Sequence, residues 1–96
     1  MDPLQQYPIP HPQVAGRVID DEAVIVLSDT GQVQVLNEVG AHVWELIDGA
    51  RSVTEIAQAI AEEFDVSLQE ASADVLEFVL ELEKEKIIVL ADQPQK

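Results

Sequence analysis

Apolar residues follow a strand-like pattern in the part of the chain that begins at residue 14. Residues 23–27 are an uninterrupted apolar run of the length expected for a central strand, and residues 17–20 are a shorter candidate. In residues 32–36 valines alternate with glutamines, which puts the two residue types on opposite sides of a strand whose sheet has one face in water. The pattern predicts three strands.

Short polar segments separate the predicted strands. Residues 20–22 are acidic and form a turn, and residues 28–31 suit a tight hairpin in which Gly31 can adopt a positive φ. Because connections this short join antiparallel neighbours, the three strands are expected to form a meander.

The apolar period changes to that of a helix after residue 36. Asn37 can accept hydrogen bonds from the free amides at the start of a helix, and Gly49 can end that helix in the left-handed conformation. Trp44 lies at the edge of the apolar face, where we expect its ring to anchor the border of the core. That face comprises Val39, Val43, Leu46 and Ile47.

Two further helices begin with the same capping pattern. Ser52 and Ser67 are each followed three residues later by glutamate, an arrangement in which both side chains bond backbone amides of the first turn. Helices are therefore predicted at residues 53–64 and 68–84, joined as a helix-turn-helix, with a short apolar strand at residues 87–90. The predicted fold class is α+β and winged helix-turn-helix-like, with a three-stranded antiparallel β-meander followed by three helices and a short C-terminal strand.

The predicted third helix has two apolar stripes. The second stripe, formed by Ala73, Leu76 and Leu80, lies more than about 90° around the helix from the first. It fits either a helix that is buried widely between its neighbours or a helix that lines a groove. The first stripe contains Leu68, Ala71, Val75, Phe78, Val79 and Leu82.

The two ends of the chain differ in composition from its middle. Residues 1–13 are rich in proline and are expected to form a flexible arm, although a segment with Tyr7 could also dock on a partner. Residues 92–96 are expected to be a frayed polar tail. The folded domain then spans residues 14–91.

The chain is strongly acidic. It has 19 acidic side chains and 5 basic ones, so its net charge is −14. This charge repels nucleic-acid phosphates and anionic lipids, so neither nucleic acid nor a membrane is an expected partner. The long helix is mainly acidic where a winged-helix protein that binds DNA needs arginine or lysine. The charge fits either encounter with a cationic partner or solubility alone.

The sequence contains no recognisable catalytic, metal or cofactor site. It has no cysteine, and the two histidines, His11 and His42, lie in the arm and on the polar side of the first helix. The four glycines are scattered and form no phosphate-binding loop. We therefore expect no enzymatic activity and no cofactor. The lack of cysteine, of a membrane-spanning run and of a signal peptide indicates a cytoplasmic protein.

A set of positions spread over residues 24–90 carries a family resemblance. Most of them are packing and turn residues, so the resemblance concerns the fold first. They are Leu36, Asn37, Trp44, Leu46, Asp48, Gly49, Ile56, Phe64, Asp65, Val66, Asp74, Val75, Phe78, Val79 and Leu82. With the order of the predicted elements, this pattern resembles the PqqD-like family, the peptide-recognition domains of ribosomally made, modified peptides.

The resemblance implies a small non-catalytic peptide chaperone. Such a protein captures the leader of a precursor peptide and delivers it to a modifying enzyme, often a radical S-adenosylmethionine (SAM) enzyme. The leader would add as an antiparallel strand to residues 32–36, whose outer edge we expect to be free, and would lie against the third helix. The expected peptide-binding residues are Gln32, Val33, Gln34, Val35, Leu36, Gln69, Ala73, Asp74, Leu76, Glu77 and Leu80.

Three alternatives stay open. A lasso-type peptide system would use the same groove but deliver the leader to a leader peptidase. An acidic winged-helix adaptor would bind a protein partner and no precursor peptide. The free strand edge also permits a homodimer.

Overall fold

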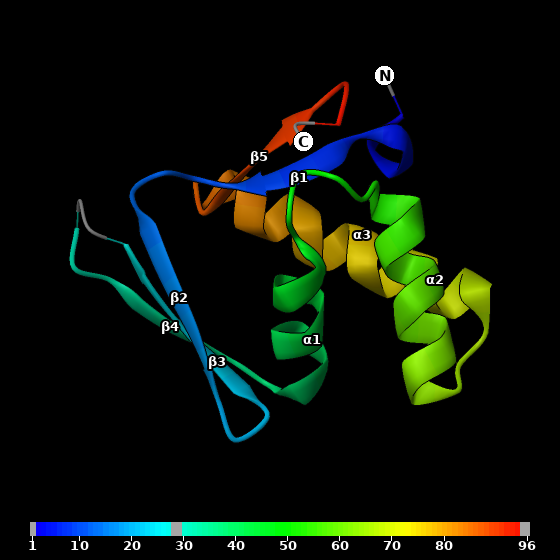
Figure 1. The fold of residues 1–96 in the computed structure, drawn as a ribbon, viewed down its shortest axis with the longest axis horizontal. Coiled ribbons are helices and arrows are strands. Elements are labelled where there is room, and N and C mark those ends of the chain that lie inside the picture. The colour runs from blue at the N-terminus through cyan, green and yellow to red at the C-terminus, as the bar shows by residue number, and fades with distance from the viewer. Residues whose placement is uncertain (1, 28–29, 95–96) are drawn as a thin grey trace.

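Figure 1 shows a computed structural model of the chain, which describes residues 2–27 and 30–94. A three-stranded sheet lies on one side of helix α1, the pair α2 and α3 lies on the other, and a two-stranded sheet crosses one end of the helices (Figure 1). This confirms the predicted α+β plan and adds one strand near the N-terminus. The elements are η1 (Pro3–Gln5), β1 (Tyr7–Pro10), β2 (Val14–Ile19), β3 (Glu22–Leu27), β4 (Val33–Leu36), α1 (Glu38–Leu46), α2 (Val53–Phe64), α3 (Leu68–Lys84) and β5 (Ile88–Ala91).

The meander consists of β2, β3 and β4, paired antiparallel in that order. Asp20 and Asp21 make the first turn with positive φ of 50° and 68°, as a two-residue connection between twisted strands requires. Gly31 has the predicted positive φ, 72°, in the second connection, while Ser28 and Asp29 lie outside the described residues. β2 is longer than predicted because all six of its residues pair with β3.

The residues of β4 alternate as predicted, but the glutamine side is the one that faces the rest of the protein. Val33 and Val35 are 58% and 63% exposed, whereas Leu36 is buried on the inner side. Gln34 also points inward, where its side-chain amide donates a hydrogen bond to the Glu85 carboxylate that follows α3. The inner face of this strand borders the polar end of α3 as well as the core, and it therefore carries Gln34. The valines lie on the face that is exposed to solvent.

Residues 3–10 are structured, so the prediction of a flexible arm is wrong for this segment. β1 pairs antiparallel with β5 over its whole length. The Pro8 side chain is fully buried, and its carbonyl accepts a hydrogen bond from the Gly49 amide at 3.2 Å. The Gln6 carbonyl accepts one from the Val53 amide at 3.0 Å, at the start of α2. Prolines are compatible with such a strand because it pairs with only one neighbour and prolines favour extended backbone.

Deleting residues 2–10 is expected to lower the free energy of unfolding by at least about 2 kcal/mol. The deletion removes the partner of β5, the buried Pro8 and Leu4, which packs against the core. Urea unfolding followed by circular dichroism measures the loss. The exposed η1 residue Gln5 provides a control, since Gln5→Ala should change stability by less than about 0.5 kcal/mol. An unchanged urea midpoint after the deletion would contradict this role of β1.

Side-chain caps begin the helices where the sequence predicts them. Asn37 Oδ1 accepts a hydrogen bond from the Gly40 amide at 2.9 Å. Ser52 and Glu55 form a reciprocal capping box, with distances of 3.2 and 2.9 Å, and a serine cap also opens α3. The end of α1 differs from the prediction, because the helix stops three residues before Gly49. Gly49 still has a positive φ, 81°, and turns the loop toward β1.

The core is aliphatic and lies among the three helices, the inner face of the sheet and β5. Trp44 is half-buried at its edge, as predicted, with its indole ring against the backbone of Gly16 in β2. A Cβ at Gly16 would lie 2.6 Å from ring atom Cε2, so this strand position requires a residue without a side chain. The fully buried aliphatic residues include Ile25, Val43, Val53, Ile56, Val75, Val79, Ile87 and Ile88.

Candidate peptide-binding groove

β4 is the last strand of the meander, and one of its edges has no strand partner in the described part of the chain. The Leu27 amide donates to the Gln32 carbonyl at 2.9 Å, and hydrogen-bonded pairs alternate along an antiparallel ladder. The register therefore directs the backbone groups of Val33 and Val35 toward the free edge. The amides and carbonyls of both valines are available to an additional strand.

A cavity of about 500 Å³ lies beside this edge, between β4, α1, α3 and the C-terminal end of α2. Its walls are mainly apolar, and it opens to solvent at Val35 and Val39, which are 63% and 41% exposed. We call it the β4–α3 groove. Its lining residues are Val35, Leu36, Asn37, Val39, Gly40, Val43, Ile60, Phe64, Val66, Ala71, Asp74, Val75 and Phe78.

Gly40 and Phe78 set the width of the groove near its centre. A Cβ at Gly40 would lie 3.4 Å from Cζ of the Phe78 ring and 3.2 Å from Cβ of Leu36. A larger residue at this position of α1 would therefore press on both neighbours. The Phe78 ring is half-buried and lines the hollows on either side of it, so one face of it is available to a guest.

The groove continues along α3 toward the C-terminal end of the helix. A second hollow of about 400 Å³ lies between β4 and the last turns of α3. The hydrogen bond from the Gln34 side chain to Glu85 joins the strand to the residue that follows the helix. The groove thus has an apolar end near Leu36 and a polar end near Val33.

Carboxylates follow the solvent side of α3 beside the groove. Asp74, Glu77 and Glu81 are exposed and lie three or four residues apart, which places them on one side of the helix. Among residues 2–27 and 30–94, no lysine or arginine forms an ion pair with these three. The rim of the groove is therefore negatively charged.

Four of the five predicted strand residues and two of the predicted α3 residues meet at this groove. The residues of β4 line it or its continuation, Asp74 lines its wall, and Glu77 lies on its rim. Gln32 precedes β4 in the hairpin and borders a different hollow that also contains His11.

The second apolar stripe of α3 does not line the groove. Gln69, Ala73 and Leu76 make up no part of its walls, and Leu76 packs partly against the core. Leu80 is 39% exposed and borders a separate hollow near the end of the helix. Successive helical residues are about 100° apart, so Leu76 lies about 200° around α3 from Asp74. Of the two explanations for the second stripe, Leu76 therefore fits a helix that is buried on more than one side and not a helix that lines a groove with this stripe.

The sequence pattern missed Phe78, Glu81 and Gly40 as groove residues. It assigned Phe78 to the core stripe, although its spacing from Asp74 was a usable signal: residues four apart lie on the same side of a helix. Gly40 gave a second signal, because glycine inside a helix often marks the close approach of a neighbour.

The histidines and carboxylates outside the groove were predicted to carry no metal or catalytic site. The His42 ring packs edge-on against Phe64, with ring centroids 5.6 Å apart and an interplanar angle of 87°. In the described part of the chain, no three His, Cys, Asp or Glu side chains are grouped so that they could hold a metal ion. None of the helices described there has the length and apolarity needed to cross a bilayer.

Several solved structures share this fold. TbiB1 in complex with the TbiA(beta) leader peptide has a TM-score of 0.77 at 28% identity, over 83% of this chain and 93% of that one. Lasso peptide synthetase B1 complexed with the leader peptide has a TM-score of 0.76 at 20% identity, over 85% and 96%. The PqqD truncation of Methylobacterium extorquens PqqCD, a RiPP recognition element, has a TM-score of 0.70 at 21% identity, over 93% and 99%. The last two similarities establish the fold alone.

Sequence comparison identifies the family. Residues 22–88 match the family model described as "Coenzyme PQQ synthesis protein D (PqqD)". A PqqA binding protein from Xanthomonas oryzae pv. oryzae is 35% identical over 65 residues, which are 68% of this chain and 71% of the relative. A PqqA binding protein from Xanthomonas campestris pv. campestris is 34% identical over the same shares of both chains. The chain belongs to the PqqD family.

Proposed function

We propose that the chain is a non-catalytic peptide-binding protein that captures the leader of a ribosomally synthesised precursor peptide and presents it to a modifying enzyme. The observation that carries the proposal is the free edge of β4 beside the apolar β4–α3 groove. An unpaired strand edge supplies backbone affinity, and a neighbouring groove supplies side-chain specificity. The relatives named PqqA binding protein and the leader-bound structure of TbiB1 support the same function.

The guest peptide would lie antiparallel to β4 as a fourth strand of the sheet. Residues directly opposite one another in an antiparallel pair project to the same face. Guest side chains opposite Leu36 and Gln34 would therefore enter the groove and reach Phe78. Those opposite Val33 and Val35 would face outward. Because α3 runs from the Leu36 end of the groove to the Val33 end, the guest would run in the same direction as α3.

Two versions of this function differ in the enzyme that receives the leader. In the version that we favour, a radical SAM enzyme in the cytoplasm accepts the leader, as the PqqD-family membership suggests. In the second version, a leader peptidase of a lasso-type system accepts it, which the similarity to leader-bound TbiB1 supports. Both versions use the same groove and differ only in the enzyme that binds next.

An amide chemical-shift titration tests the proposed function directly. The labelled protein is titrated with the leader half of the short precursor peptide encoded beside its gene, and a scrambled peptide is the control. We expect the largest shifts in β4, Gly40 and Phe78, with saturation at about micromolar concentrations, as suits a small interface. No shifts at millimolar peptide, or shifts confined to β1 and β5, would contradict the proposal.

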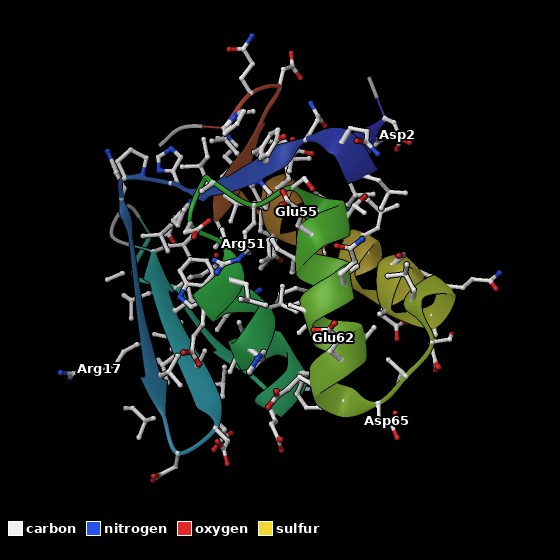
Figure 2. All side chains as sticks on the ribbon, turned by 45° about the vertical axis from the view of Figure 1, so that its right-hand side comes forward. Asp2, Arg17, Arg51, Glu55, Glu62 and Asp65 are labelled. Carbon is white, nitrogen blue, oxygen red and sulfur yellow. The ribbon has the colours of Figure 1, made fainter. Side chains whose placement is uncertain are left out.

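The acidic rim predicts faster association with leaders that carry lysine or arginine. For such a leader, Asp74→Asn/Glu81→Gln should slow association about two- to fivefold at low salt and flatten its dependence on salt, because rim charges act mainly on encounter. Stopped-flow measurements at several salt concentrations check this. Glu62→Gln/Glu63→Gln removes the same charge from two exposed residues of α2 that do not line the groove and should have little effect; Figure 2 shows Glu62 on this helix. An equal change in the association rate of both double variants would show that only the net charge of the protein affects association, and would contradict a specific role of the rim.

A further inference from the structure

The outer face of the three-stranded sheet is apolar and exposed. Val33 and Val35 of β4 are 58% and 63% exposed, and Val26 lies opposite Val33 on β3 and is 37% exposed. Ile19 on β2 is 50% exposed on the same face. α1 packs on the other side of the sheet (Figure 1), and no described segment covers this one. We define the outer face by Arg17, Ile19, Val24, Val26, Val33 and Val35.

The outer face differs in charge from the rest of this acidic chain. The net charge is −14, yet β2, β3 and β4 together contain one acidic residue, Glu22, which pairs with Ile19 at the tip of this face. Arg17 belongs to the outer face and points away from the helices (Figure 2). An apolar face with a single cation suits a protein surface that offers apolar side chains and a carboxylate. A second copy suits it less well, because two chains of the same negative charge repel each other.

A leader strand on β4 would be continuous with this face. Its outward side chains would stand beside Val33 and Val35, while its other side chains would be held in the groove on the inner side. We propose that the outer face and the outward side chains of the bound leader together form the docking surface for the modifying enzyme. The enzyme then binds the loaded protein more tightly than the empty one and reaches the peptide without opening the groove. This inference rests on the proposed function.

The test compares a variant of the outer face with a charge-matched control. Arg17→Glu/Val26→Thr changes β2 and β3 and leaves β4 intact. Arg51→Glu, at a side chain that is 45% exposed in the loop before α2, changes the net charge by the same amount at a residue that is not part of the outer face (Figure 2). Each protein is measured for binding of the leader. It is then measured, with and without saturating leader, for binding of the modifying enzyme encoded beside the precursor gene.

We expect Arg17→Glu/Val26→Thr to bind the leader as the wild type does and the enzyme at least about tenfold more weakly. Arg51→Glu should match the wild type in both measurements. If the double variant binds the leader less well, the single variant Arg17→Glu repeats the test. Enzyme binding that is unchanged in both outer-face variants, or equally strong without leader, would overturn the inference.

Two other outcomes are distinguishable from these. A wild-type protein that binds no leader would overturn the proposed function itself, whatever the enzyme does. Sedimentation of the wild-type protein alone reports self-association. A dimer that Arg17→Glu/Val26→Thr dissociates would assign the outer face to a second copy of this chain and overturn the inference.

Discussion

Replacing Val35 with proline is expected to weaken leader binding by at least about tenfold while the domain stays folded. The Val35 amide points to the free edge, so proline removes a donor that a guest strand needs and none that β3 uses. Edge strands tolerate proline for this reason. Leaving the guest carbonyl unpaired costs about 1–3 kcal/mol, and the proline ring adds a steric barrier to close approach. Calorimetric titration with the leader measures affinity, and urea unfolding measures stability.

Two matched variants locate this effect in the backbone of β4. Val35→Thr keeps the amide and a β-branched side chain at an exposed position, so leader affinity should change by less than about twofold. Gln34→Pro removes a donor that bonds to β3 and should instead lower the free energy of unfolding by about 1–3 kcal/mol. Leader binding by Val35→Pro at wild-type affinity would exclude strand addition at this edge.

The helices could be predicted from the sequence because their signals are local. α2 and α3 begin and end at the predicted residues, 53–64 and 68–84. Their starts depend on serine side chains that bond to backbone only three residues away. Such bonds need no knowledge of the rest of the fold. The meander was predictable for a similar reason, since its short connections allow only neighbouring strands to pair.

The N-terminal strand could not be predicted because its partners lie far away in the sequence. Tyr7 pairs opposite Ala91, and the carbonyls of Pro8 and Gln6 accept hydrogen bonds from the loop between α1 and α2 and from the start of α2. Proline-rich composition resembles that of a disordered arm until those partners are known. A local sequence pattern cannot predict the pairing of two segments that lie at opposite ends of the chain.

The free edge of the groove was predictable, but the side chains that line it were only partly so. The order of the strands leaves β4 at the end of the sheet, whereas the alternation in β4 does not say which side faces inward. That choice depends on α3, whose end offers the Glu85 carboxylate to Gln34. The two apolar stripes of α3 are ambiguous in the same way. The helical periodicity shows which residues share a face of α3, but it does not show which element packs against that face.

Phe78→Ala and Leu76→Ala are expected to separate the groove from the second stripe of α3. Phe78 lines the groove, so its truncation should weaken leader binding about ten- to a hundredfold by removing apolar contact with a guest side chain. Leu76 lies on another side of the helix and packs partly against the core. Its truncation should lower the free energy of unfolding by about 1–3 kcal/mol and leave leader affinity within about twofold. Calorimetric titration and urea unfolding are measured on both variants.

The conservative variant Phe78→Leu decides between a contact role and a structural role for the ring. If Phe78 contacts the guest, leucine keeps part of the apolar contact, and leader affinity should fall between those of the wild type and Phe78→Ala. If the ring only holds α1 and α3 apart at Gly40, affinity should instead follow the loss of stability in all three variants. Weak leader binding by a stable Leu76→Ala would place the guest on the second stripe and would contradict the groove described here. The comparison therefore tests which side of α3 meets the peptide, a choice that the periodicity of the sequence leaves open.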